Sequence, residues 1–253
     1  MTDLLTIDDL TAGFGASEAL HGVSLTMGHE RLALVGGSGA GKSLIARAIL
    51  RLLPPGAWLK GRIAFDGIDL AHADMRLLRG RRIGWIAQDP RLSLNPVMRV
   101  GAQIEEGLRL HRGLKSRAAR DAALALIETV RLPEPARVHA LYPHELSGGM
   151  GQRAMIAMML AGEPDLLIAD EPTSALDAST AMQVLDLLDE LVERRSMGLL
   201  FISHDLRLVE GFCDRVAVIE AGRIVETCAA DALASSRQPY TSRLLAARPT
   251  LAP

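Results

Sequence analysis

Apolar residues along this chain follow two alternating patterns, short continuous runs and longer stretches with helical spacing. The short runs predict buried strands, which are bounded by glycine, proline or charged residues. They are Leu32–Val35, Arg62–Phe65, Ile83–Ala87, Leu166–Ala169, Leu199–Ile202, and the pair Val216–Ile219 and Arg223–Glu226 around a turn at 220–222. Helical spacing predicts helices over Leu44–Leu53, Arg117–Val130 and Thr180–Arg194. Strands that alternate with helices indicate an α/β fold with a mainly parallel sheet.

The middle of the chain has a different pattern. From about residue 97 to residue 161 the strand signals stop and helical signals dominate. This stretch predicts an inserted helical subdomain, bounded roughly by Gln88 and Gly162.

Composition narrows the class of protein. The 253 residues are 49% apolar and 23% charged, which is typical of a globular protein of one large domain or two small ones. The richest apolar run, Ala154–Gly162, is far shorter than the roughly 20 residues of a spanning helix, so we do not expect a transmembrane protein. Two cysteines without CxxC spacing favour a reducing cytoplasm, and a net charge of −2 gives no sign of nucleic-acid binding.

The most specific motif is a glycine-rich loop. Gly36-Gly37-Ser38-Gly39-Ala40-Gly41-Lys42-Ser43 fits GxxxxGK[ST] between a predicted strand and a predicted helix. Backbone N–H groups of such a loop, with the positive end of the next helix, bind phosphates. Lys42 supplies charge to the β- and γ-phosphates, and the Ser43 hydroxyl can ligate Mg²⁺. The alternative, an incidental lysine in a glycine-rich turn, does not explain this position.

A second motif places two carboxylates at the end of the strand run Leu166–Glu171. Successive side chains of a strand point to opposite faces, so Asp170 and Glu171 are expected to have different roles. We assign Asp170 to Mg²⁺ and Glu171 to orienting and deprotonating an attacking water. Two solvated acids at a strand end are the alternative, and the neighbouring phosphate loop makes the functional interpretation stronger.

A third motif, Leu146-Ser147-Gly148-Gly149-Met150-Gly151-Gln152, is a serine-and-glycine turn that opens a helix. Its backbone can also bind phosphate. Two phosphate-binding turns with one lysine-bearing loop are most simply explained if each turn serves half of a shared site.

These residues resemble the nucleotide-binding subunits of ATP-binding-cassette (ABC) transporters over essentially the whole chain. Three motifs match the Walker A loop, the Walker B strand and the signature, with Met150 where many members have glutamine. Further matches are the Q-loop glutamine Gln88, the D-loop Ser174-Ala175-Leu176-Asp177, the switch histidine His204, and Phe14 at the adenine-stacking position. Gly151 and Cys228 depart from the residues common in the family.

The resemblance implies a P-loop NTPase cassette at 1–253, with a mainly parallel sheet core (about 1–88 and 163–253), an N-terminal antiparallel β region and a helical subdomain (about 89–162). It implies ATP and Mg²⁺ as ligands. The residues implied for ATP are Phe14, Gly36, Gly37, Ser38, Gly39, Ala40, Gly41, Lys42, Ser43 and Leu44. Those implied for Mg²⁺ are Ser43, Gln88 and Asp170, and those for catalysis are Glu171, His204 and Gln88. Ser147, Gly148 and Gly149 are implied to act on the nucleotide of a second cassette.

A finer resemblance points to the oligopeptide, dipeptide and nickel importer branch. It rests on Gln88-Asp89-Pro90, Ser93-Leu94-Asn95-Pro96, Gln238-Pro239-Tyr240-Thr241 and Arg243-Leu244-Leu245. Shorter strings look most like the nickel-type members, namely Leu20–Thr26, Val35–Gly39 and Met155–Met158.

The function that this implies is ATP hydrolysis that energises import of nickel or a nickel chelate. The implied partners are a sister cassette, two integral permeases and, indirectly, an extracytoplasmic binding protein, at the cytoplasmic face of the inner membrane. Alternatives are a dipeptide or oligopeptide importer, a soluble accessory ATPase like those of phosphonate degradation, and a nucleotide-binding module without turnover. A soluble ABC protein of DNA repair or translation is disfavoured, because the chain shows neither tandem cassettes nor a coiled-coil insertion.

Other residues have simpler interpretations. His139 and His144 lack an ordered set of metal ligands and are expected at the surface. Methionines 150, 155, 158 and 159 are expected to pack in the core, because they recur at helical spacing among alanines. The basic cluster Arg76, Arg79, Arg81 and Arg82 is expected to form a solvated face.

Overall fold

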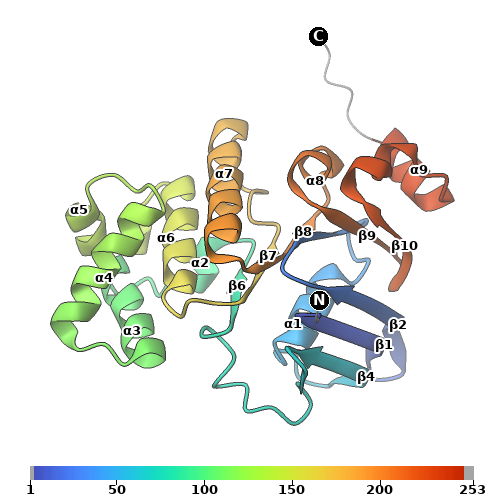
Figure 1. Ribbon diagram of the computed structural model, residues 1–253, viewed down its shortest axis with the longest axis horizontal. Coiled ribbons are helices and arrows are strands. Elements are labelled where there is room, and N and C mark those ends of the chain that lie inside the picture. Colours follow the sequence, from blue (N-terminus) through green and yellow to red (C-terminus); the bar gives the residue numbers. More distant parts are fainter. Residues whose placement is uncertain (1–2, 248–253) are drawn as a thin grey trace. The chain divides into compact units, whose positions relative to one another are not determined.

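The computed structural model describes residues 3–247, and the chain divides into two compact units (Figure 1). The first unit combines Met1–Met75 with Gly198–Pro253, and the second is Arg76–Met197. These boundaries differ from the expected limits of the helical subdomain, about 89–162, because β6 and β7 fall in the same unit as the helices between them. The narrower subdomain remains a prediction.

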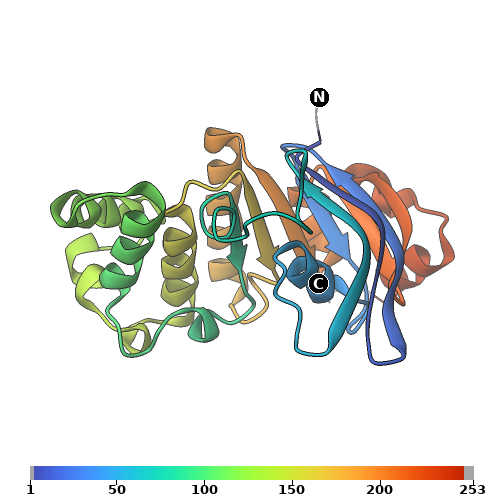
Figure 2. The ribbon, with the colours of Figure 1, turned by 90° about the horizontal axis from the view of Figure 1, so that it is seen from below.

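An antiparallel sheet forms one layer of the first unit, as the family resemblance implied. Its strand order is β2-β1-β4-β5, with β1 pairing antiparallel to both β2 and β4. The strands are β1 (Leu5–Phe14), β2 (Ser17–Met27), β4 (Ala57–Phe65) and β5 (Ile68–Asp69). Asp66 and Gly67 both have positive φ, 49° and 76°, as a tight turn between β4 and β5 requires. The curvature of this sheet is visible in Figure 2.

The other strands of the first unit run in the order β10-β9-β3-β8. They are β3 (Arg31–Val35), β8 (Gly198–Ser203), β9 (Arg215–Glu220) and β10 (Arg223–Ala229). Strand β3 pairs in parallel with β8 and β9, and β10 closes an antiparallel hairpin through Ala221 and Gly222, both at positive φ. Val35 lies opposite Ser203 in the register, so the residues that follow these two strands emerge at the same edge.

Helices complete the first unit. They are α1 (Lys42–Ile49), α8 (Leu206–Phe212), the 3₁₀ segment η2 (Ala230–Ser235) and α9 (Pro239–Ala246). Helix α1 ends four residues before the predicted limit at Leu53. The physical reason is Arg51, which adopts a left-handed φ of 51° and donates from its guanidinium to the carbonyls of Leu70 and Ala71.

The second unit places a parallel strand pair beside a group of helices. Strands β6 (Ile83–Ile86) and β7 (Leu166–Asp170) pair so that Ile86 lies opposite Ala169. Helix α6 contacts β6 and α7 and also packs against α3 and α4 (Figures 1 and 2). The helices are α2 (Pro90–Ser93), α3 (Val100–Arg112), α4 (Ser116–Thr129), α5 (Pro135–Ala140), η1 (Pro143–Glu145), α6 (Gly148–Leu160) and α7 (Ala178–Arg195).

His139 is not a surface residue, which corrects the expectation from sequence. The residue is 7% exposed and its Nε2 lies 2.8 Å from Oε1 of Glu105. Gly101 on α3 makes room for the ring, since a Cβ there would come within 2.1 Å of it. His144 is exposed as expected, and of the four methionines Met155 is fully buried while the others are half-buried.

The arginines of the basic cluster differ in exposure. Among the four arginines of the basic cluster, Arg76 and Arg81 are exposed, whereas Arg82 is half-buried and paired with Asp165 at 2.6 Å.

Over residues 3–247, no helix combines the length and apolar character needed to cross a bilayer.

Candidate nucleotide-binding site

The phosphate loop lies between a buried strand and a helix, as the sequence predicted. Strand β3 is apolar and almost wholly buried, and α1 begins directly after Gly41, which has φ 105° and ψ 2°. A side chain at Gly41 would be strained by this conformation, and its Cβ would lie 2.5 Å from a methyl of Leu20. The backbone path of the loop therefore requires glycine at this position.

Lys42 is folded back across the loop. Its Nζ donates to the carbonyl oxygens of Gly36 at 2.8 Å and Gly37 at 3.1 Å, and the residue is only 7% exposed. Carbonyl oxygens partly satisfy a desolvated ammonium, but a phosphate anion offers stronger, charge-assisted hydrogen bonds. Ser43 is exposed and Leu44 half-buried on the first turn of α1.

Two distant segments hold the loop in place. The N–H of Gly222, in the β9–β10 turn, donates to the carbonyl oxygen of Ala40 at 3.1 Å. The N–H of Gly37 donates to the hydroxyl oxygen of Tyr240 on α9 at 2.9 Å. Neither contact was predicted from the sequence, because the partners are separated from the loop by about 200 residues.

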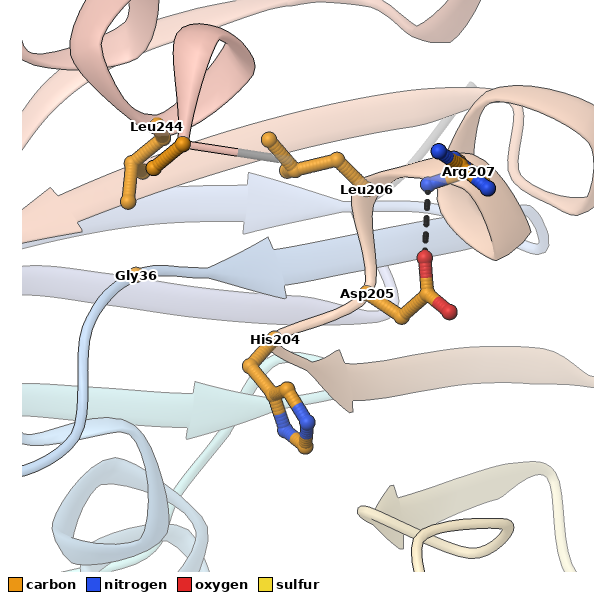
Figure 3. A pocket seen from close by; sticks show the side chains of 7 residues that line it. Gly36, His204, Asp205, Leu206, Arg207 and Leu244 are labelled. Carbon is orange, nitrogen blue, oxygen red and sulfur yellow. Dashed lines mark hydrogen bonds between the residues drawn. The ribbon is translucent and has the colours of Figure 1, made fainter. Parts of the chain in front are cut away.

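His204 follows β8, and the structure brings it near the start of the phosphate loop. His204 and Gly36 line the same cavity, of about 390 Å³, together with Asp205, Leu206, Arg207, Leu244 and Ala247 (Figure 3). Asp205 caps α8 by accepting from the Arg207 N–H at 2.9 Å, so its carboxylate points away from the exposed imidazole (Figure 3). The parallel pairing of β3 with β8 explains why the residues after both strands meet here.

Phe14 ends β1 and is 42% exposed. An exposed aromatic ring is available for stacking on a base. Its assignment to adenine stays a prediction.

In the second unit, Asp170 and Glu171 differ because the backbone changes conformation between them, and not because side chains alternate along a strand. Strand β7 ends at Asp170, which is 7% exposed, and Glu171 has a left-handed φ of 50°. Such values are uncommon for residues other than glycine and concentrate at functional sites. Asp170 and Glu171 therefore differ in backbone conformation, and their different roles stay a prediction.

Gln88 and Glu171 lie side by side in the structure. The Gln88 Nε2 donates to Oε2 of Glu171 at 3.3 Å. The parallel pairing of β6 with β7 puts the segments that carry them at one edge. Two of the three residues expected to act in catalysis are thus in contact within the second unit.

Ser147 opens α6 as the sequence predicted. It is the N-cap of the helix, and its Oγ accepts from the N–H of Met150 at 3.3 Å. Ser147 and Gly148 are exposed, whereas Gly149 is buried. The first turn of α6 therefore presents backbone N–H groups beside exposed small residues, as an anion site requires.

The D-loop is tied to Glu171 at one end and to α7 at the other. Ser174 donates from its N–H and its hydroxyl to the Glu171 carbonyl oxygen, at 3.2 and 3.0 Å. Asp177 caps α7, accepting from the Thr180 N–H at 3.0 Å and from the Thr180 hydroxyl at 2.7 Å. The Thr180 N–H is the main cause of the lowered pKa of Asp177. Ala175 is exposed and Leu176 half-buried.

Thr180 contacts both the D-loop and α6, the helix that begins in the signature motif and is here called the signature helix. No sequence signal indicated this role. A Cβ built on Gly149 would lie 2.3 Å from Cγ2 of Thr180, so the two residues are already in close contact. A Cβ on Gly148 would lie 3.7 Å from Leu176, which is an ordinary contact distance.

The residues expected to ligate Mg²⁺ fall in both units. Ser43 belongs to the first, and Gln88 and Asp170 belong to the second. Their hydroxyl, amide and carboxylate oxygens are the hard ligands that Mg²⁺ prefers, so the donor set fits this ion. The joint site stays a prediction.

Comparison with known proteins gives consistent matches. The family model described as "ABC transporter" matches residues 20–174. The chain is 45% identical to the oligopeptide transport ATP-binding protein OppD of Bacillus subtilis, over 99% of this chain and 73% of that protein. It is 46% identical to a putative peptide import ATP-binding protein of Brucella abortus, with coverage of 98% and 76%.

Solved structures share the fold. A post-hydrolysis dimer of the ATP-binding cassette MJ0796 bound to ADP and Pi matches with a TM-score of 0.78 and 28% identity, over 89% of this chain and 98% of that one. A bacterial Atm1-family ABC exporter with ATP bound matches with a TM-score of 0.79 and 29% identity, covering 96% of this chain and 42% of that one.

The contact between Gly149 and Thr180 yields a test of stability. We expect Gly149→Ala to lower the free energy of unfolding by about 1–2 kcal/mol, because overpacking outweighs the helical gain of alanine. Adding Thr180→Ser, which removes Cγ2 but keeps the hydroxyl that bonds Asp177, should recover most of this loss. Urea denaturation of both single variants and the double variant measures the coupling.

Gly148→Ala is the matched control and should shift stability by less than about 0.5 kcal/mol, since its Cβ finds ordinary space. Strictly additive effects of Gly149→Ala and Thr180→Ser would contradict the contact.

Proposed function

Since the chain belongs to the ATP-binding subunits of ABC transporters and is an ABC-type ATPase, we propose that it energises import of short peptides through a separate membrane permease. The observation that carries the proposal is similarity over nearly the whole chain, at 45–46% identity, to proteins named for oligopeptide transport and peptide import. This favours the peptide alternative over the nickel function that short sequence strings suggested.

The proposal assigns phosphate binding to the loop 36–43. Its support is the geometry of the first unit, where Lys42 already occupies the loop and Gly36 shares a cavity with His204. His204 is assigned to the γ-phosphate and Phe14 to the adenine. Mg²⁺, when bound through Ser43, Gln88 and Asp170, would offset negative charge on the phosphates.

Glu171 is assigned to the attacking water, as general base. The Gln88 amide restrains this carboxylate through the 3.3 Å hydrogen bond, and Ser174 restrains the backbone beside it through the Glu171 carbonyl. A movement of the Gln88 side chain would therefore directly change the hydrogen bonding of the Glu171 carboxylate. This contact supports the proposal that Gln88 couples movement of the permease to ATP hydrolysis.

We place a second cassette opposite the first, with Ser147, Gly148 and Gly149 of one chain completing the nucleotide site of the other. The support is the exposed, serine-capped start of α6 and the dimeric cassette structure that this chain resembles. Nucleotide that contacts both chains only in the closed dimer would favour closure by that difference in affinity.

The permease is proposed to contact the segment after Gln88. There Gln103 holds a turn by accepting from the Asn95 N–H at 2.8 Å and donating to the Asn95 and Met98 carbonyls. The turn presents Val97, which is 79% exposed. A rigid turn with an exposed apolar residue suits docking to a membrane subunit, and it would hold the chain at the cytoplasmic face of the inner membrane.

Glu171→Gln tests the catalytic assignment. General-base catalysis contributes about 10²–10⁴-fold, so phosphate release by the complex purified through a tag on this chain should fall at least about 100-fold while ATP binding persists. Glu193→Gln makes the same chemical change at an exposed position of α7 and should leave turnover unchanged. Normal turnover in Glu171→Gln would refute the assignment. No phosphate release by the wild-type complex would favour a module without turnover.

Uptake assays test the cargo. In a strain that lacks this chain, accumulation of a labelled dipeptide should fall and be restored by the wild-type chain but not by Glu171→Gln. Accumulation of labelled nickel should not change. The reverse pattern would restore the nickel interpretation. Co-purification without integral permeases would instead favour a soluble accessory ATPase.

A further inference from the structure

The C-terminal helix α9 reaches the phosphate loop, and its contact explains a motif that the ATPase assignment leaves unused. Gln238-Pro239-Tyr240-Thr241 entered the sequence analysis only as a mark of the importer branch. In the structure, the Tyr240 hydroxyl accepts a hydrogen bond from the Gly37 N–H at 2.9 Å. Gly37 is the second residue of the loop, 203 positions away in the chain.

A partly buried polar cluster fixes α9 on strand β10. Thr241 is fully buried, and its hydroxyl donates to the carboxylate of Glu226. Ser236 donates to both oxygens of the same carboxylate, at 2.8 and 2.7 Å. Gln238 caps the helix by accepting from the Thr241 N–H at 2.8 Å. Because these groups satisfy one another around the buried Thr241, they define the position of the helix.

A second contact restrains the tyrosine ring. Arg243, one turn further along α9, lies with its guanidinium 5.6 Å from the centre of the Tyr240 ring. The same guanidinium donates to Glu220 of β9 at 2.8 Å. Arg243 is well exposed, so its contribution to stability is small, but it narrows the choice of ring orientation.

The Gly37 residue is held from both sides of its Cα. Its N–H is bound by Tyr240, and its carbonyl oxygen accepts from Lys42 Nζ at 3.1 Å. Lys42 also binds the carbonyl of Gly36, which belongs to the same peptide group as the Gly37 N–H. Rotation of that peptide group would break the hydrogen bond to Tyr240. The same rotation would move the Gly36 carbonyl, which accepts from the Lys42 ammonium.

We propose that Tyr240 is a positioning residue for the phosphate loop, which it holds in the conformation that binds nucleotide. This rests on the proposed role of loop 36–43 in binding ATP. A loop that is ordered before the ligand arrives loses less conformational freedom on binding. The hydroxyl acts on the backbone of the loop through the Gly37 N–H, so its removal should weaken binding and spare the chemical step.

Tyr240→Phe tests this with one atom removed. ATP should bind the purified complex about three- to tenfold more weakly, the range given by loss of one neutral hydrogen bond. KM for ATP should rise in proportion, and kcat at saturating ATP should stay within twofold. Without nucleotide, amide hydrogen exchange in the segment 32–43 should quicken, because the Gly37 N–H loses its partner.

Tyr142→Phe is the matched control, since it makes the same change at the chain's other tyrosine, in the second unit. It should alter neither ATP affinity nor exchange in segment 32–43. Unchanged affinity and exchange in Tyr240→Phe would overturn the proposal, as would an equal effect of Tyr142→Phe or a loss of kcat at constant KM. A wild-type complex that binds no ATP would instead refute the proposed function.

Discussion

The site in the first unit depends on one partly desolvated positive charge, the ammonium of Lys42. At 7% exposure the side chain has given up most of its hydration, and neutral carbonyls of its own loop replace the water. Anionic oxygens, such as those of a phosphate, bind an ammonium about twice as strongly as these neutral carbonyls. The buried strand β3, the hairpin turn at Gly222 and the hydroxyl of Tyr240 all serve to hold the carbonyls around this charge.

In the second unit, the main constraint is on the orientation of one carboxylate, that of Glu171. Glu171 sits in a left-handed conformation just after a buried strand, and its neighbours hold both its side chain and its carbonyl. The same D-loop continues into Asp177, which caps α7 and binds Thr180, and Thr180 packs on Gly149 of the signature helix. The proposed base and the proposed contact with a second cassette therefore belong to one connected set of residues. A displacement at one end has a physical route to the other.

Sequence reasoning succeeded where chemistry is local. The phosphate loop and the serine cap of α6 each need particular residues within a few positions, and the structure has them as predicted. It failed where partners are distant along the chain. Burial of His139 depends on Glu105 and on space at Gly101, and the early end of α1 depends on carbonyls near residue 70. The Tyr240 contact with Gly37 spans most of the chain, so no local pattern reveals it.

The question of cargo shows why short strings mislead in such a protein. The nickel-like strings lie in β2, at the end of β3 with its loop, and in α6, and most of their apolar residues are fully buried. Packing and phosphate binding determine the residues at those positions, and neither depends on what the permease carries. Similarity across 98–99% of the chain also includes exposed positions, such as Val97. For this reason the peptide interpretation outweighs a match of a few core residues.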